Sequence, residues 1–175
     1  VAGHSLLRRH VGADAGGSMI RIRLVAVGKV KEGYFREAFL EYEKRLGRFC
    51  RLSVTEIKEE LLGKDGAAER AAVVRREGER ILPELRGRVA ALAVEGKKLS
   101  SEGLSAWMTE AVSRGAGELT FVIGGSYGLS DAVKGRADLL LSFSDMTFPH
   151  TLTRVLLAEQ LYRAFTIAEG SGYHK

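Results

Sequence analysis

The chain has 175 residues, of which 45% are hydrophobic and 28% charged, and its formal net charge is +5 at pH 7. This balance indicates one globular domain with a buried core, and no apolar run approaches the roughly 20 residues that a membrane-spanning helix needs. The single cysteine, Cys50, excludes an intramolecular disulfide and favours a reducing compartment, so we expect a cytoplasmic protein and no membrane. The four histidines and one cysteine form no zinc-binding pattern, and no metal is expected.

Residues 1–18 show no sustained apolar period, and we expect an N-terminal extension there that is disordered or not native. From Met19 onward, apolar runs predict strands alternating with helices. The expected strands cover residues 20–27, 52–57, 89–94, 119–123 and 139–142, and the expected helices 34–48, 67–85, 101–114, 130–136 and 151–168. A turn is expected at residues 95–98. The alternation predicts one α/β domain, residues 19–175, with a mainly parallel sheet covered by helices on both faces.

The helix expected at residues 67–85 is rich in charge. Its arginines are Arg70, Arg75, Arg76 and Arg80, and its interspersed carboxylates are Glu69, Glu77 and Glu79. Such a mixture is typical of a solvated helix face. The net positive charge is compatible with a polyanionic partner, although charge by itself is weak evidence for nucleic-acid binding.

A glycine cluster, Gly124-Gly125-Ser126-Tyr127-Gly128, follows the fourth expected strand. A glycine-rich turn between a strand and a helix is a usual position for a nucleotide in an open sheet. The spacing departs from the G-x-G-x-x-G fingerprint, although Asp145 lies at about the distance of a ribose-binding carboxylate. A pair of tight turns that require glycine is the structural alternative.

The stretch from Phe143 to Phe148 lies just past the last expected strand, where an open α/β sheet places its ligand crevice. Its backbone groups, together with the side chains of Met146 and Phe148, are suited to surround a flat heterocycle. The following Pro149 favours the start of a helix. On that helix Arg154 shares a stripe with apolar residues, so it either reaches water or is buried with an anionic or hydrogen-bonding partner.

The chain closes with Tyr173-His174-Lys175 after a glycine-rich turn. Chain ends are commonly frayed. An aromatic ring, an imidazole and a cation are also suited to stack on a base and to contact a phosphate.

Several motifs in this order resemble the bacterial ribosomal RNA large-subunit methyltransferase H family, the pseudouridine N3-methyltransferases of the SPOUT class. They are residues 24–29 (LVAVGK), 41–46 (EYEKRL), 121–129 (FVIGGSYGL), 141–150 (LSFSDMTFPH), 159–165 (EQLYRAF) and 173–175 (YHK). The resemblance covers residues 19–175. It implies an α/β fold with a C-terminal trefoil knot, S-adenosylmethionine as methyl donor, a homodimer, and ribosomal RNA in the ribosome as substrate.

The resemblance also implies functional residues. The donor would be bound by Leu92, Gly124, Phe143, Ser144, Asp145, Met146, Thr147 and Phe148. The catalytic group would comprise Arg154, Arg163, Tyr173, His174 and Lys175. The family usually has an acidic residue after the leucine of the third strand, where this chain has Ala93.

The N3–H of pseudouridine is an imide proton that must leave at or before methyl transfer. His174 is a candidate base, and the arginines and Lys175 are candidate stabilisers of negative charge or phosphate contacts. Two other functions remain open on the sequence: a non-catalytic ribosome-binding or RNA-binding protein, and a nicotinamide-dependent oxidoreductase.

Overall fold

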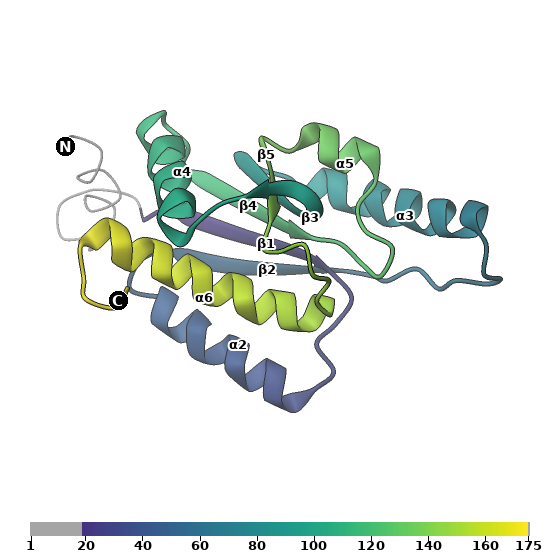
Figure 1. Cartoon of the computed structure of the whole chain (residues 1–175), viewed down its shortest axis with the longest axis horizontal. Helices are drawn as coiled ribbons and strands as arrows, with labels where there is room; N and C mark the ends of the chain where they lie inside the picture. The colour runs from purple at the N-terminus through teal and green to yellow at the C-terminus, as the bar shows by residue number, and fades with distance from the viewer. Residues whose placement is uncertain (1–18, 175) are drawn as a thin grey trace.

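Five parallel strands form a single sheet in the order β2-β1-β4-β3-β5 (Figure 1). The structure is a computed structural model that describes residues 19–174. The strands are β1 (Arg21–Val27), β2 (Arg51–Ile57), β3 (Arg88–Lys98), β4 (Glu118–Ile123) and β5 (Leu139–Ser142). The helices are α2 (Gly33–Leu46), α3 (Ala67–Ile81), α4 (Ser101–Ser113), α5 (Asp131–Arg136) and α6 (His150–Glu169), with a 3₁₀ turn, η1 (Leu82–Glu84), after α3. The predicted α/β class is confirmed, whereas the expected extension (residues 1–18) and Lys175 lie outside the described residues.

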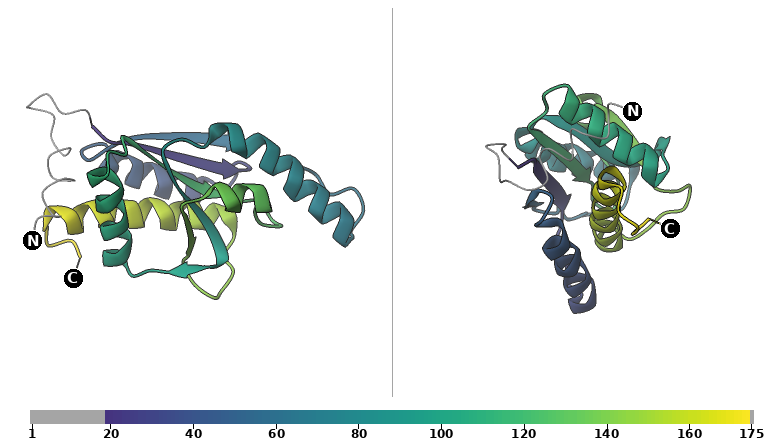
Figure 2. Two further views of the ribbon diagram at one scale, coloured as in Figure 1. Left: turned by 90° about the horizontal axis from the view of Figure 1, so that it is seen from above. Right: turned by 90° about the vertical axis from the view of Figure 1, so that its left-hand side faces the viewer.

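Helices cover both faces of the sheet, as the apolar strands predict. Helices α2, α4 and α6 pack on one face, where α6 lies beside α2, and α3 and α5 cover the other face (Figures 1 and 2). Each central strand therefore contributes to two cores: Leu24 of β1 faces the first, and Val25 the second. The free energy of burial comes from apolar surface removed from water, at about 25 cal/mol per Å².

Helix α6 provides the centre of the larger core. Leu157, Leu161 and Phe165 are almost completely buried, and the ring of Phe165 stacks on Phe49 with centroids 5.3 Å apart. The helix starts after Pro149 and ends at Gly170, whose φ of +77° is left-handed and favours glycine. Cys50 packs in the same core, and burial raises the pKa of its thiol to about 12.

Two predicted element boundaries are wrong. The strand expected to end at residue 94 continues to Lys98, because the segment expected to turn instead pairs with β5 a second time. The helix expected to reach residue 85 leaves α-helical geometry after Ile81, because Pro83 lacks the N–H that a continuing helix would use.

Strand β3 meets β5 in two separate registers. Leu92 and Lys97 both pair with Leu141, and the residues between them bulge away. At Gly96 the two backbones are in contact, since a Cβ atom there would lie 2.7 Å from the carbonyl carbon of Leu140. The end of β3 therefore folds closely against β5, and only glycine fits at the contact. The trefoil knot implied by the resemblance stays a prediction.

The contact predicts that Gly96→Ala destabilises the fold. The added methyl group would overlap the backbone of Leu140, and we expect the free energy of unfolding to fall by about 1–3 kcal/mol in urea titrations. Gly63→Ala is the control, because no atom lies within 4 Å of a Cβ at that position. Equal unfolding midpoints for Gly96→Ala and the wild type would contradict the contact.

Candidate functional site

A cavity of about 590 Å³ lies at the carboxyl ends of β3, β4 and β5. This is the edge at which parallel α/β sheets bind ligands, and the volume is within the usual range for a small-molecule site. Four stretches of the chain line this cavity: residues 92–95, residues 123–129 apart from Tyr127, residues 141–144 and residues 146–150. Lys134 and Thr153 complete the lining. The cavity therefore joins the glycine cluster to the loop that precedes α6, two features that sequence analysis selected separately.

Seven of the eight residues expected to bind the donor line this cavity. They are Leu92, Gly124, Phe143, Ser144, Met146, Thr147 and Phe148. The exception is Asp145, whose exposed carboxylate forms an ion pair with Lys98 outside the cavity wall. The carboxylate is thus engaged with the end of β3, an arrangement that favours a role in holding the loop.

Serine side chains shape the loop between β5 and α6. Ser142 Oγ donates to the carbonyl oxygen of Ser144 (3.0 Å), and Ser144 Oγ accepts from the amide of Met146 (3.0 Å). Such local bonds replace the backbone pairing that ends with β5. They turn the chain after β5, and Met146 at the edge of the cavity remains largely exposed.

The glycine cluster forms a tight turn on the opposite wall. Gly125 and Gly128 form an isolated antiparallel bridge, and Gly128 has a φ of +87°. A Cβ on Gly124 would lie 3.0 Å from the backbone of Gly128, so the turn closes on itself at that residue. The alternative of tight turns that require glycine therefore describes this cluster, and the turn also forms part of the cavity wall.

Glu77 of α3 lies directly beneath this turn. The side chain was expected on a solvated helix face, and that prediction is wrong, because Glu77 is only 2% exposed. Its Oε1 accepts from the amide of Glu60 (3.0 Å), whereas Oε2 has no hydrogen-bond partner among the described residues. Burial raises the pKa of this carboxyl above its usual value. A Cβ on Gly125 would lie 2.9 Å from Glu77 Oε2, so the carboxyl supports the turn from outside the cavity.

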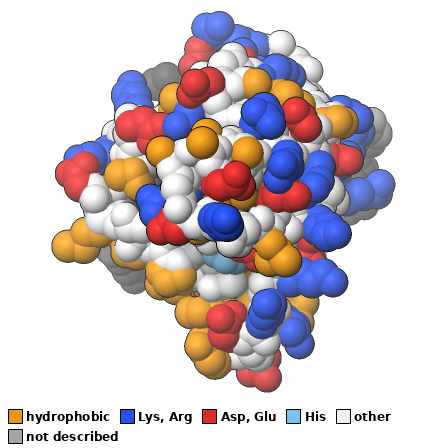
Figure 3. Space-filling view, turned by 90° about the vertical axis from the view of Figure 1, so that its right-hand side faces the viewer, with side chains coloured by type: hydrophobic (Ala, Val, Ile, Leu, Met, Phe, Trp, Pro, Cys, Tyr) orange, Lys and Arg blue, Asp and Glu red, His pale blue; other side chains and the backbone are white. Residues whose placement is uncertain are grey.

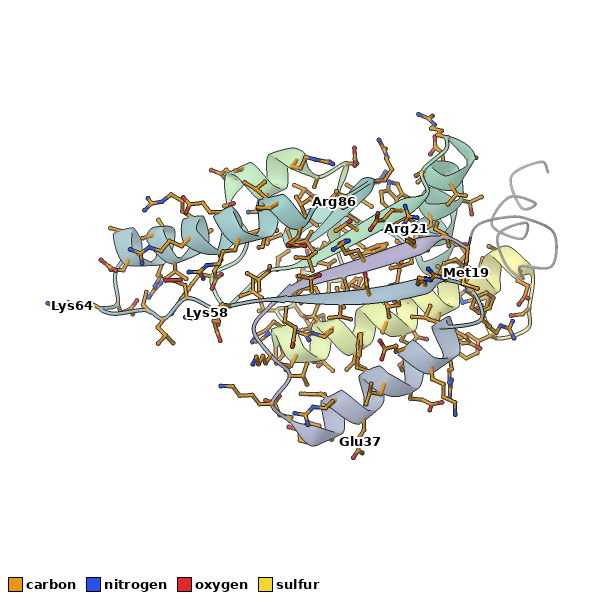
Figure 4. The ribbon with its side chains drawn as sticks, turned by 180° about the vertical axis from the view of Figure 1, so that it is seen from behind. Met19, Arg21, Glu37, Lys58, Lys64 and Arg86 are labelled. Carbon is orange, nitrogen blue, oxygen red and sulfur yellow. The ribbon has the colours of Figure 1, made fainter. Side chains whose placement is uncertain are left out.

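The other charged residues of α3 fit the solvated-face interpretation. Arg70 pairs with Asp65, Arg80 pairs with Glu60, and Arg75 lies near Glu79. Acidic and basic side chains alternate on the face shown in Figure 3, with hydrophobic side chains between them. The labelled Lys64 projects from the loop between β2 and α3, away from the sheet (Figure 4).

Sequence analysis missed one charged pair in the cavity wall. Glu95 of β3 and Lys134 of α5 both line the cavity and form an ion pair. The hydrogen bond from Lys134 lowers the pKa of the Glu95 carboxyl. The sequence feature that could have indicated this pair is Glu95 itself, an acidic residue three positions after Leu92. It lies in the segment of residues 95–98, which was expected to form a turn. The family usually has an acidic residue at the position of Ala93, and Glu95 lies two residues after that position.

Of the two alternatives for Arg154, reaching water or being buried with a partner, the structure shows the second. Arg154 Nη1 donates to Glu56 Oε2 (2.7 Å), and its Nη2 donates to the carbonyl oxygen of Gly28 (3.2 Å). The side chain thereby connects α6 to the carboxyl ends of β1 and β2. It does not line the cavity.

The described part of the C-terminal tail packs on its own chain, away from the cavity wall. The Tyr173 hydroxyl donates to Glu159 Oε1 (3.3 Å), and its ring packs edge-on against Tyr162. His174 Nε2 lies 2.7 Å from Glu102 Oε1, and its Nδ1 lies 3.3 Å from Arg163 Nη1. Three of the predicted catalytic residues, Arg163, Tyr173 and His174, are thus brought together, whereas Arg154 is elsewhere. Sequence analysis did not identify Glu102 or Glu159 as their partners.

Comparison with known proteins supplies independent information. Residues 20–174 match the family described as predicted SPOUT methyltransferase. Two similar relatives are named ribosomal RNA large subunit methyltransferase H. The one from Streptococcus equi subsp. zooepidemicus is 46% identical, and the one from Bifidobacterium adolescentis is 48% identical, with 89% of this chain and 100% of each relative covered. A crystal structure of a probable methyltransferase from Bordetella pertussis Tohama I has the same fold, with a TM-score of 0.55 at 13% identity over 92% of this chain and 98% of that one.

The buried Glu77 predicts a pH-dependent stability. A carboxyl whose pKa is raised by folding binds its proton more tightly in the folded state, so stability is lost as pH rises from the ordinary glutamate range through the raised pKa. Glu77→Gln should escape this loss. We expect the melting temperature of the variant relative to the wild type to rise by at least about 2 °C between pH 5 and pH 8.

The control for this prediction is Glu79→Gln, which removes a mostly exposed carboxylate from the same helix. Its melting temperature should stay at a constant offset from the wild type across the same pH range. A constant offset for Glu77→Gln as well would show that Glu77 is not the titrating group.

Proposed function

The chain belongs to the SPOUT methyltransferase family, and from this membership we propose that it transfers a methyl group from S-adenosylmethionine to N3 of a pseudouridine in large-subunit ribosomal RNA. The observation that carries the proposal is the cavity at the carboxyl edge of the sheet, because seven of the residues assigned to the donor line it. Relatives that share nearly half of the residues over their full length are named for ribosomal RNA methylation.

The cavity fits the proposed donor in size and chemistry. Phe143 and Phe148 provide aromatic surface for a flat purine, and the turn at Gly124 presents backbone instead of side chains. Glu95, Ser126 and Thr147 supply polar groups for ribose and amino-acid atoms. Such a mixture of apolar walls and a few polar groups is typical of small-molecule sites.

Methyl transfer from a sulfonium requires alignment and exclusion of water more than covalent assistance. The N3–methyl bond forms as the sulfur–methyl bond breaks, the electron pair of that bond returns to sulfur, and the N3 proton leaves. His174 is the candidate acceptor of this proton, and Arg163 and Lys175 are candidates to stabilise the N3 anion or to contact phosphate. The aromatic ring of Tyr173 is suited to stack on a nucleobase of the RNA. For Arg154, the ion pair with Glu56 supports a positioning role through α6.

The proposal includes a homodimer, a cytoplasmic location with the ribosome as partner, and a knotted single domain from Met19 to Lys175. Half-buried apolar residues along α6, among them Leu152, Val155 and Leu156, support a partner surface. The double pairing of β3 with β5 supports the knot. Among the described residues, no helix is long and apolar enough to cross a membrane.

Mass spectrometry of large-subunit ribosomal RNA tests the activity. We expect RNA from a strain lacking this gene to carry one unmethylated pseudouridine, and ribosomes from that strain to accept a labelled methyl group from S-adenosylmethionine when the purified protein is added. Donor binding in calorimetry without methylation of any ribosomal RNA would contradict the reaction. Ribosome binding without donor binding would favour the non-catalytic alternative.

Changes to the tail test the catalytic assignment. Deleting residues 173–175 should leave donor affinity within about twofold, because neither Tyr173 nor His174 lines the cavity. It should lower the methylation rate of ribosomes by at least about 100-fold, the lower range for a positioned acid–base group. His174→Ala alone should reproduce most of this loss if His174 is the base.

The control is Lys64→Ala, at the exposed loop between β2 and α3 (Figure 4), which should retain the wild-type rate. If the tail-deleted protein methylates ribosomes at the full rate, residues 173–175 are not part of the active site.

A further inference from the structure

Helix α3 contacts the glycine turn and the start of α5 through two consecutive residues. Glu77 lies beneath Gly125, at which a Cβ atom would be 2.9 Å from Glu77 Oε2. Gly78 lies against Ser130, since a Cβ atom on Gly78 would be 2.3 Å from Ser130 Oγ. Ser130 in turn caps α5 by accepting from the amide of Val133 (3.3 Å). The segment between the turn and α5 is thus held at both ends by α3, which packs beside α5 (Figure 1).

The segment held in this way forms one wall of the proposed donor cavity. Five of its residues line the cavity: Gly124, Gly125, Ser126, Gly128 and Leu129. Glu77 and Gly78 are not part of the lining. They can therefore act on a bound donor only through the backbone that they support.

The surroundings of the Glu77 carboxyl favour its neutral form. Oε1 accepts from the amide of Glu60, but Oε2 has no hydrogen-bond partner among the described residues. A buried oxygen without a partner is far more costly when it is ionised than when it is neutral. The charged groups nearby are Glu59, Glu60 and Arg80, and Arg80 is already paired with Glu60. The turn contributes only the backbone of Gly125 at this contact, so an ionised Oε2 would need water where the turn now packs.

We propose that Glu77 is a positioning residue for the methyl donor, because its carboxyl holds the glycine turn in the shape that binds S-adenosylmethionine. This inference rests on the proposed function and names a residue that acts from outside the cavity. The neutral carboxyl fits beneath Gly125 without water. When the carboxyl ionises, water enters at Oε2, the turn moves, and donor affinity falls. Donor and proton therefore favour the same position of the turn, and their binding is linked.

Calorimetric titrations with S-adenosylmethionine at pH 5 and pH 8 test this link in the wild type and in Glu77→Gln. The amide keeps the size of the carboxyl and is neutral at both pH values. Because folding raises the pKa of Glu77, wild-type affinity is highest below that pKa and falls as pH rises through it. The two proteins should bind the donor within about twofold of each other at pH 5. At pH 8 the wild type should bind at least about fivefold more weakly, the lower range of coupling between sites.

The ratio of the two affinities isolates Glu77. Other titrating groups, such as the amino group of the donor, are the same in both proteins and cancel in the ratio. Glu77→Ala removes the support altogether and should weaken donor binding about tenfold at both pH values, with a native circular dichroism spectrum. The control is Glu79→Ala, which removes a mostly exposed carboxylate from the same helix and should bind the donor as the wild type does.

The outcomes separate this inference from the proposed function. A constant ratio between wild-type and Glu77→Gln affinities from pH 5 to pH 8 overturns the positioning role, whether or not Glu77→Ala folds. Wild-type affinity in a folded Glu77→Ala also overturns it, and in both cases the proposed function stands. A wild type that does not bind the donor overturns the proposed function, and the positioning role with it.

Discussion

The double contact between β3 and β5 is the constraint on which the cavity at the carboxyl edge of the sheet depends. Leu141 pairs with Leu92 and again with Lys97, and Gly96 allows the two backbones to touch. This contact directs the residues after β5 across the carboxyl edge of the sheet. Leu141 and Phe143 then line this cavity. A looser contact would leave this wall without support, since β5 is at the edge of the sheet and has β3 as its only strand neighbour among the described residues.

The buried arginine of α6 gives this edge its second support. Arg154 joins Glu56 at the end of β2 to the carbonyl of Gly28 at the end of β1. Burying an isolated guanidinium would be costly, so the carboxylate and the carbonyl are required for α6 to pack as it does. Because the loop of residues 143–149 leads directly into α6, the position of this helix also sets the loop. A residue expected in catalysis thus contributes through packing, on the side of α6 that faces the sheet.

The proposed donor cavity and the tail occupy different places in one chain. Tyr173 and His174 contact Glu159 and Glu102, and none of these four residues lines the cavity. In the proposed reaction, the methyl group takes the in-plane position that the N3 proton leaves, so the proton must be removed before the methyl group is transferred.

The sequence by itself determined the α/β class, the strand and helix order, and most of the lining of the proposed donor cavity. Those features arise from local periodicity and from motifs such as residues 143–148, which lie on one continuous segment. Only the tertiary structure decided that Glu77 is buried beneath Gly125, that β3 extends to Lys98, and that the tail meets Glu102. Each of these depends on residues far apart in the chain, and a charged side chain has the same local pattern whether its helix faces water or another element. The packing of α3 on the glycine turn and of α4 on α6 removes that ambiguity.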